Sequence, residues 1–172
     1  MIAAVVALGF LVVVLVAALV ANRGVHLRRP KPGSRRILVP FTGGTLDPTV
    51  LAAAIRIAQA QEATLVPAYL LRVPLQYPED TPLANEVEVA LPLLEAVEHA
   101  ALRHGVPVDA RIEKGRTPTH ALKRLWDVED FDWIVAPAES GGNGGFTSKD
   151  VTWILDHAPS QTVLLKPAPV VA

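Results

Sequence analysis

An uninterrupted apolar segment at the start of the chain constrains the fold more than any other feature. From Ile2 to Ala21 there is no charged residue. A helix of this length rises about 1.5 Å per residue and spans roughly 30 Å, the thickness of a bilayer's hydrocarbon core. We therefore predict a transmembrane helix over residues 1–22. The remaining residues, about 150 in number, are enough for one domain and too few for a second independent core.

Two other interpretations of this segment stay open. A cleaved signal peptide normally has basic residues before a shorter apolar stretch, followed by a small-residue cleavage site. No Lys or Arg precedes the apolar run, although Ala17, Ala18 and Ala21 would suit cleavage. The other interpretation is a buried core helix, but a domain of this size rarely encloses an all-apolar helix on every side.

A basic flank follows the apolar segment. Its members are Arg23, Arg28, Arg29, Lys31, Arg35 and Arg36. By the positive-inside rule, this flank predicts a single-pass protein of the cell membrane with its N-terminus outside and its domain in the cytoplasm. The flank would also reach anionic headgroups, at about 1 kcal/mol per residue, although a role in topology alone explains it equally well. Residues 23–35 are polar and contain Pro and Gly, so we predict a short tether there.

The rest of the chain is acidic. Six of the 16 Lys and Arg lie in the basic flank, so residues 37–172 hold 10 against all 17 Asp and Glu, a formal charge of −7. Nucleic acid is therefore not an expected partner, because its phosphates require a basic face. The chain has no Cys, which excludes disulfides, thiolate catalysis and Cys-based zinc sites. The expected partners are the lipid bilayer and either a second copy of the chain or another membrane protein.

Beyond the tether, short apolar runs alternate with helical patterns. The runs at 36–41, 63–71, 106–112, 132–136 and 162–165 predict strands. Helices are expected after Asp47, from Leu83 to Ala101, after Thr117 and over 150–157. Pro92 should kink or interrupt the second of these helices. The alternation predicts an α/β fold in which helices cover both faces of a parallel sheet, with a ligand crevice beyond the carboxyl ends of the strands.

Two glycine-rich turns fall at such strand ends. The candidate anion-binding or nucleotide-binding residues there are Thr42, Gly43 and Gly44 after the first strand, and Gly142, Asn143, Gly144, Gly145, Thr147 and Ser148 after the fourth. Backbone amides of a glycine turn and of a helix N-terminus can cradle an anion. The alternative for the second turn is a flexible surface loop.

No catalytic or metal-binding constellation is predicted. The five histidines lack the spacing of a metal motif, and triads are recognised by geometry, which spacing alone does not give. Asp127, Glu129, Asp130 and Asp132 form an acidic turn before the fourth strand, on the side opposite the crevice. We expect that turn to be solvated.

Taken in order, the segments from Arg36 to Pro167 resemble the universal stress protein family. The resemblance rests on RRILVPFTGG, GVPVDARIEKGRTPTHAL, FDWIVAPA, a glycine-rich loop and ILDHAPSQTVLLKP. It implies a five-stranded parallel sheet of Rossmann-like type over residues 36–167, followed by a tail at 168–172. It also implies a dimer through the last strand, which is frequent in the family.

The resemblance fails at the nucleotide site. Nucleotide-binding members of that family have an Asp after the first strand and, after the fourth, Gly, two residues, Gly, nine residues, and then Gly-Ser or Gly-Thr. Here Thr42 stands at the Asp position, and Pro137, which lacks an amide proton, stands at the first glycine. Gly145 is the last glycine of the chain, so the final pair is missing as well. We therefore expect no bound cofactor, and ATP only as the alternative.

These observations predict a membrane-tethered module of the universal stress protein type that is not an enzyme. It would bind or regulate a partner at the cytoplasmic membrane surface. One alternative is an ATP-binding stress sensor that uses the Gly142–Gly145 loop, with weak nucleotide hydrolysis. The other is a scaffold subunit of a membrane protein complex.

Overall fold

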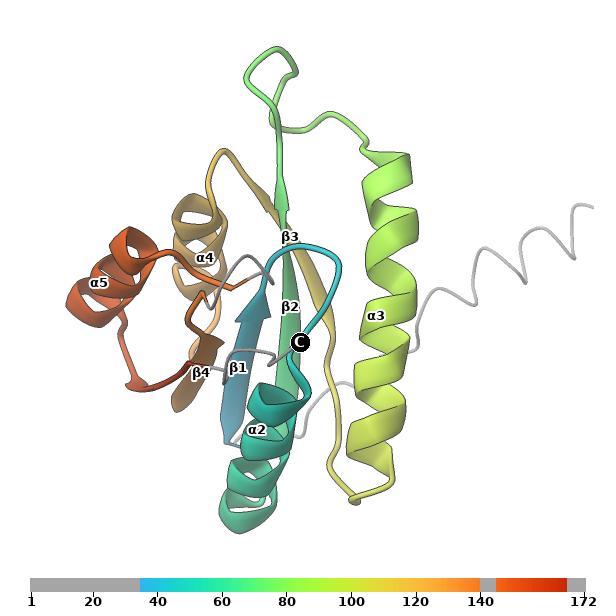
Figure 1. Ribbon diagram of the computed structural model, residues 1–172, viewed down its shortest axis with the longest axis vertical. Coiled ribbons are helices and arrows are strands. Elements are labelled where there is room, and N and C mark those ends of the chain that lie inside the picture. The colour runs from blue at the N-terminus through green and yellow to red at the C-terminus, as the bar shows by residue number, and fades with distance from the viewer. Residues whose placement is uncertain (1–34, 140–144, 167–172) are drawn as a thin grey trace, which may run out of the picture.

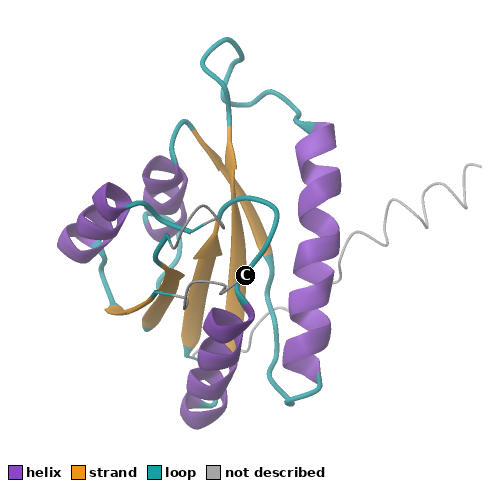
Figure 2. Ribbon diagram, in the orientation of Figure 1, coloured by secondary structure: helices purple, strands orange, loops and turns teal. Residues whose placement is uncertain are grey.

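The computed structural model describes residues 35–139 and 145–166, which form a sheet with helices on both sides (Figures 1 and 2). Its strands are β1 (Arg36–Phe41), β2 (Thr64–Arg72), β3 (Arg111–Gly115), β4 (Trp133–Pro137) and β5 (Gln161–Leu165). Its helices are α2 (Pro48–Gln61), α3 (Ala84–Leu102), α4 (Pro118–Trp126) and α5 (Ser148–His157). The strands pair in parallel in the order β3-β2-β1-β4-β5, so the predicted five-stranded parallel sheet is confirmed.

Three predicted segments lie outside the described residues and stay predictions. These are the transmembrane helix at 1–22, all of the tether except Arg35, and the tail at 168–172. Within residues 35–139 and 145–166, no helix has both the length and the apolar character needed to cross a membrane.

The helix starts follow from local sequence signals. Asp47 caps α2, because its Oδ1 accepts from the Thr49 amide at 2.7 Å, and Pro48 then occupies the first helical position. The Thr117 side chain caps α4 by accepting from the His120 amide at 3.1 Å. Both caps match the sequence prediction, since a Ser, Thr, Asp or Asn followed by Pro satisfies an orphan donor and presets φ.

The third strand lies further along the chain than predicted. We predicted 106–112, but β3 covers Arg111–Gly115 and is preceded only by an isolated bridge between Leu65 and Val108. That bridge and the pair Ala68–Arg111 share one register, so the ladder is interrupted at Pro67, which lies between Leu65 and Ala68 on β2. Proline has no amide proton to donate to a neighbouring strand, which accounts for the gap.

We predicted that Pro92 would kink or interrupt this helix, and α3 is not interrupted there. The helix runs from Ala84 to Leu102 with Pro92 inside it, on the exposed side. A proline removes one helical hydrogen bond and crowds the carbonyl four residues earlier. On a solvent-facing side, water can satisfy that carbonyl, and the packed residues Leu94, Val97 and Ala101 hold the next turns of the helix against the sheet.

Two apolar layers enclose the sheet. On the face covered by α2 and α3, Ile37 and Val39 of β1 pack among residues of both helices. On the other face, Leu38 of β1 packs with α4 and α5 residues such as Leu122 and Ile154. Because side chains alternate along a strand, β1 feeds both layers, and it reads as the continuous apolar run typical of a central parallel strand.

Candidate functional site

The candidate crevice lies where the strand order reverses. The chain proceeds from β1 to β2 and β3 on one side of the sheet and then crosses to β4 on the other side of β1. In open α/β sheets, ligands bind outside the carboxyl ends of the two strands that flank this switch point. The candidate crevice is therefore expected beside the loops that follow β1 and β4, and both candidate glycine turns belong to these loops.

On the β1 side, the turn is open and its helix is already capped. Thr42 is half-buried, whereas Gly43 and Gly44 are exposed and a Cβ on either would meet nothing within 4 Å. Gly43 has a φ of +78°, a conformation that favours glycine. The carboxylate of Asp47 caps the first turn of α2, so this helix N-terminus already has a negative group bound to it.

On the β4 side, the loop returns to the sheet at Gly145 and Phe146. The Phe146 amide donates to the Pro137 carbonyl at 2.9 Å, and the Glu139 amide donates to the Phe146 carbonyl at 2.8 Å. A Cβ on Gly145, whose φ is +104°, would lie 3.1 Å from the Glu139 nitrogen, so glycine is needed there for close backbone approach. The other candidates of this loop, Gly142, Asn143 and Gly144, lie outside the described residues.

At the start of α5, the predicted anion donors are engaged within the chain. Thr147 and Asp150 form a capping box: the Asp150 amide donates to the Thr147 hydroxyl oxygen at 3.3 Å, and the Thr147 amide donates to Asp150 Oδ2 at 3.2 Å. The Thr147 hydroxyl also donates to Asp150 Oδ2, at 2.6 Å. Ser148 is exposed, and its carbonyl accepts from Thr152. A carboxylate therefore occupies this helix N-terminus as well, which disfavours a second anion.

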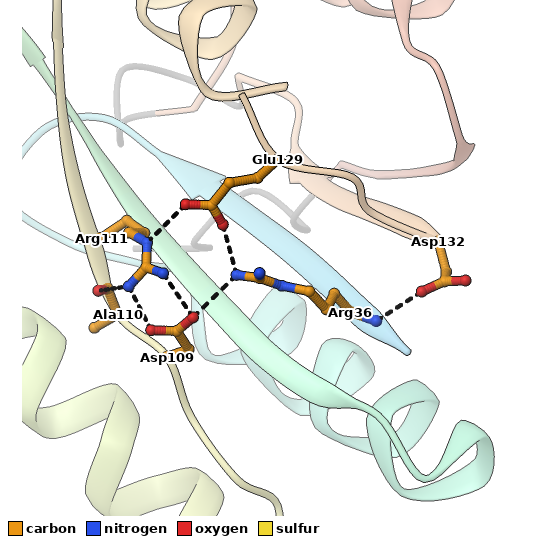
Figure 3. A network of polar contacts seen from close by, with 6 residues as sticks. All are labelled: Arg36, Asp109, Ala110, Arg111, Glu129 and Asp132. Atoms are coloured by element: carbon orange, nitrogen blue, oxygen red, sulfur yellow. Dashed lines mark hydrogen bonds and ion pairs between the residues drawn. The ribbon is translucent and has the colours of Figure 1, made fainter. Parts of the chain in front are cut away.

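A second cluster, at the amino end of the sheet, was not predicted (Figure 3). Asp109 is its buried centre, with Oδ2 at 2.9 Å from Arg36 Nη2 and at 2.8 Å from Arg111 Nη2. Glu129 joins both cations, at 2.7 Å from Arg36 and 3.2 Å from Arg111. We call Arg36, Asp109, Arg111 and Glu129 the amino-end network. Its members come from β1, the approach to β3, β3 itself and the turn before β4.

The amino-end network corrects two expectations. The acidic turn is not simply solvated, because Glu129 pairs with two guanidinium groups and Asp132 Oδ2 accepts from the Arg36 amide at 2.7 Å. We predicted Arg36 to be part of the basic flank that faces the membrane. Instead it is the first residue of β1, and its guanidinium lies in this network and over the Phe131 ring. Arg35 is exposed and donates to Gln61 of α2. The remaining flank residues, Arg23, Arg28, Arg29 and Lys31, lie outside the described residues.

Two hollows in the described surface lie away from the crevice. One, of about 100 Å³, lies between α3 and β3 and is lined mainly by apolar groups, including Leu91, Leu94 and Ile112. The other, of about 420 Å³, opens between the end of α2 and the α3–β3 connection. Among residues 35–139 and 145–166, no group of three or more His, Asp or Glu is placed to hold a metal ion.

The fold has clear relatives among known proteins. The model of the universal stress protein family matches residues 33–166. The chain belongs to the universal stress protein family. No curated protein matches it in sequence.

Solved structures of universal stress proteins share its fold. One from Burkholderia pseudomallei is 21% identical, with 81% of this chain and 100% of that chain covered and a TM-score of 0.57. A complex with dAMP from Archaeoglobus fulgidus is 12% identical, with 76% and 96% covered and a TM-score of 0.56. An AMP-bound protein from Arabidopsis thaliana is 15% identical, with 78% and 92% covered and a TM-score of 0.54. At these identities, the likeness establishes the fold alone.

Proposed function

We propose that this universal stress protein is a non-catalytic, membrane-tethered module that binds or regulates a partner at the cytoplasmic membrane surface. The crevice keeps the position that the fold provides for a nucleotide, while its chemistry has changed. The domain would act through what it contacts, and the N-terminal segment would determine where it acts.

The observation that carries this proposal is the Thr147–Asp150 capping box. The amide and the hydroxyl of Thr147, which would be donors to a phosphate, both donate to Asp150. A phosphate entering here would have to displace a carboxylate and would then be repelled by it. Across the crevice, Thr42 stands where family nucleotide binders have an Asp, and Pro137 supplies no amide.

Copurification and titration test the loss of nucleotide binding. Full-length protein extracted in mild detergent should carry no nucleotide, and ATP or AMP should give no calorimetric signal up to about 1 mM, a limit of roughly 4 kcal/mol in binding free energy. Asp150→Asn should keep the cap geometry and remove the charge. A gain in AMP binding by this variant would show that the Asp150 charge is what prevents nucleotide binding. Stoichiometric nucleotide in the purified wild type would overturn the proposal.

The proposed membrane location rests on the predicted transmembrane helix and needs its own test. The protein should stay in the membrane fraction after carbonate extraction. Added protease should digest the domain in inverted vesicles and spare it in right-side-out vesicles, because the basic flank predicts a cytoplasmic domain. The appearance of a soluble, N-terminally shortened protein would instead support signal-peptide cleavage.

A nucleotide-binding sensor is the second candidate function, because the relatives from Archaeoglobus fulgidus and Arabidopsis thaliana are complexes with dAMP and AMP.

A homodimer is also part of the proposal. β5 is an edge strand with half-buried Val163, Leu164 and Leu165, which a second copy would cover. Crosslinking in membranes would distinguish this dimer from a scaffold subunit that is captured with other proteins.

A further inference from the structure

The loop between β2 and α3, residues 73–83, projects beyond the carboxyl end of the sheet and is attached to it by cations (Figure 1). Arg116 Nη1 donates to the carbonyls of Pro74 at 2.7 Å and Tyr77 at 2.9 Å. Lys114 Nζ donates to the Thr81 carbonyl at 3.0 Å. Two basic side chains at the end of β3 therefore hold the loop through its backbone.

Within this attachment, the Glu79 carboxylate of the loop lies among basic groups. Its Oε1 is 3.2 Å from Arg116 Nε, and its Oε2 is 3.6 Å from Arg124 Nη1. His120 Nδ1 is 3.7 Å from Oε1, but that nitrogen accepts the Arg116 amide proton at 3.3 Å. The two guanidinium groups therefore supply the attraction. We call Glu79, Arg116 and Arg124 the carboxyl-end cluster.

The local charge is unusual for this domain. Residues 37–172 have a formal charge of −7, yet Arg116 and Arg124 pair here with two carboxylates, Glu79 and Glu113, and Lys114 binds the Thr81 carbonyl of the same loop. Glu113 belongs to β3 and pairs with Arg124 Nε at 3.3 Å, so it is fixed in the sheet. Glu79 lies on a loop and is 35% exposed, so it is the carboxylate that can leave.

We propose that Glu79 occupies an anion site, and that the phosphate group of a small soluble phosphate monoester displaces it. The planar forks of Arg116 and Arg124 suit phosphate oxygens, and a phosphate monoester carries up to two negative charges against one for Glu79. Arg116 and Glu79 are both half-buried but still reached by water, and such a pair contributes at most about 1 kcal/mol, so exchanging one partner costs little. Release of Glu79 would also loosen the β2–α3 loop, because Arg116 contacts both the Glu79 carboxylate and the backbone carbonyls of the loop.

This site is separate from the crevice between β1 and β4. It lies at the carboxyl end of β3 and beside the last turn of α4, which carries Arg124, and none of the glycine-turn residues contributes to it. The proposal therefore stands whether or not the crevice binds a nucleotide. Inorganic phosphate is the probe of choice, because it has no base or ribose for the crevice to recognise.

Calorimetry of the full-length protein with sodium phosphate at a constant ionic strength of about 0.1 M tests the displacement. Removing the internal competitor with Glu79→Gln should tighten phosphate binding about fivefold, since apparent affinity rises with the fraction of open sites. Asp80→Asn is the matched control: it makes the same charge change one residue away on an exposed side chain and should alter affinity less than about twofold. Adding Arg124→Gln to Glu79→Gln should abolish the gain.

Amide exchange provides the structural readout. The Tyr77 amide donates to Pro74 at 3.1 Å and the Thr81 amide to Pro78 at 3.2 Å, so both should exchange faster in phosphate if the loop is released. No phosphate binding by either wild type or Glu79→Gln would overturn the proposal, as would equal gains from Glu79→Gln and Asp80→Asn. Phosphatidic acid presents the same phosphate chemistry. Binding to vesicles that contain it, without binding of soluble phosphate, would refute a soluble ligand.

Discussion

The amino-end network and the carboxyl-end cluster use the same ion-pair chemistry at opposite ends of the sheet, and they differ in burial. Asp109, between Arg36 and Arg111, is 1% exposed. Glu79, beside Arg116, is 35% exposed. A buried carboxylate that loses a cation cannot regain water, whereas an exposed carboxylate can. We therefore expect the first cluster to hold the fold and the second to open.

The difference agrees with what each end of the sheet does. Arg36 is the first residue of β1, so the amino-end network fixes the point where the chain enters the domain after the predicted tether. The carboxyl end of a parallel α/β sheet is where ligands approach. A rigid joint at one end and a releasable contact at the other would let the domain respond to a ligand without loosening its attachment.

The largest effect should come from Asp109→Ala. It leaves the guanidinium groups of Arg36 and Arg111 facing each other with only Glu129 between them, and breaking a buried pair in this way costs about 3 kcal/mol. Urea unfolding of the full-length wild type and variant in the same detergent would measure the loss of unfolding free energy. Asp130→Ala, on an exposed neighbour of Glu129, should cost less than about 0.5 kcal/mol. Similar losses of unfolding free energy in the two variants would mean that burial of Asp109 does not determine how much it stabilises the fold.

Next in size is Gly115→Ala, at the end of β3. A Cβ there would lie 2.5 Å from the Ala121 nitrogen and 2.8 Å from its Cα, so the backbone of α4 would have to move. Overpacking of this kind costs about 2 kcal/mol. The same displacement would misplace Arg116, so the β2–α3 loop should exchange its amide protons faster.

Gly44→Ala supplies the control for that variant. A Cβ on Gly44 meets nothing within 4 Å, so this change tests the backbone effect of Gly→Ala without a clash. Its unfolding free energy should stay within about 0.5 kcal/mol of wild type. If Gly115→Ala and Gly44→Ala had the same unfolding free energy, the close packing of β3 against α4 would not explain how Arg116 is held in place.

Much of the fold could be predicted from the sequence because its signals are local. The strand at 36–41 and the caps at Asp47 and Thr117 follow from neighbouring residues, and all three were predicted correctly. The start of β3 was wrong because Pro67, on a different strand, interrupts the ladder. That interruption depends on which strands are neighbours and on their register, and a single strand's sequence contains neither.

The site was less readable for the same reason. The turns at Thr42 and Gly145 were found from their glycines and positions after strands. The capping box of Thr147 and Asp150 is also a local pattern, because the two residues lie three positions apart at the start of α5. The amino-end network joins Arg36 to Asp109 and Glu129, which are far apart in sequence, so only the strand order brings them together.

A pair of double-mutant cycles would compare the two clusters directly. Arg36→Met with Glu129→Gln should give a coupling free energy of about 1.5 kcal/mol, because both side chains are largely shielded from solvent. Arg124→Met with Glu79→Gln should give less than about 0.5 kcal/mol, because Arg124 is 49% exposed. Raising the salt concentration should weaken the second coupling more than the first. Equal couplings at both ends would mean that exposure does not separate the clusters.

The smallest effect on stability should come from Glu79→Gln alone. Its partners keep other contacts, since Arg116 still holds the carbonyls of Pro74 and Tyr77, and a half-buried pair that water reaches contributes at most about 1 kcal/mol. Local opening should nevertheless become more frequent, so amide exchange in the β2–α3 loop should accelerate while exchange in β1 stays unchanged. A variant that lost as much stability as Asp109→Ala would show that Glu79 supports the whole fold, and the carboxyl-end cluster would then be a structural element with no capacity to exchange its carboxylate for a ligand.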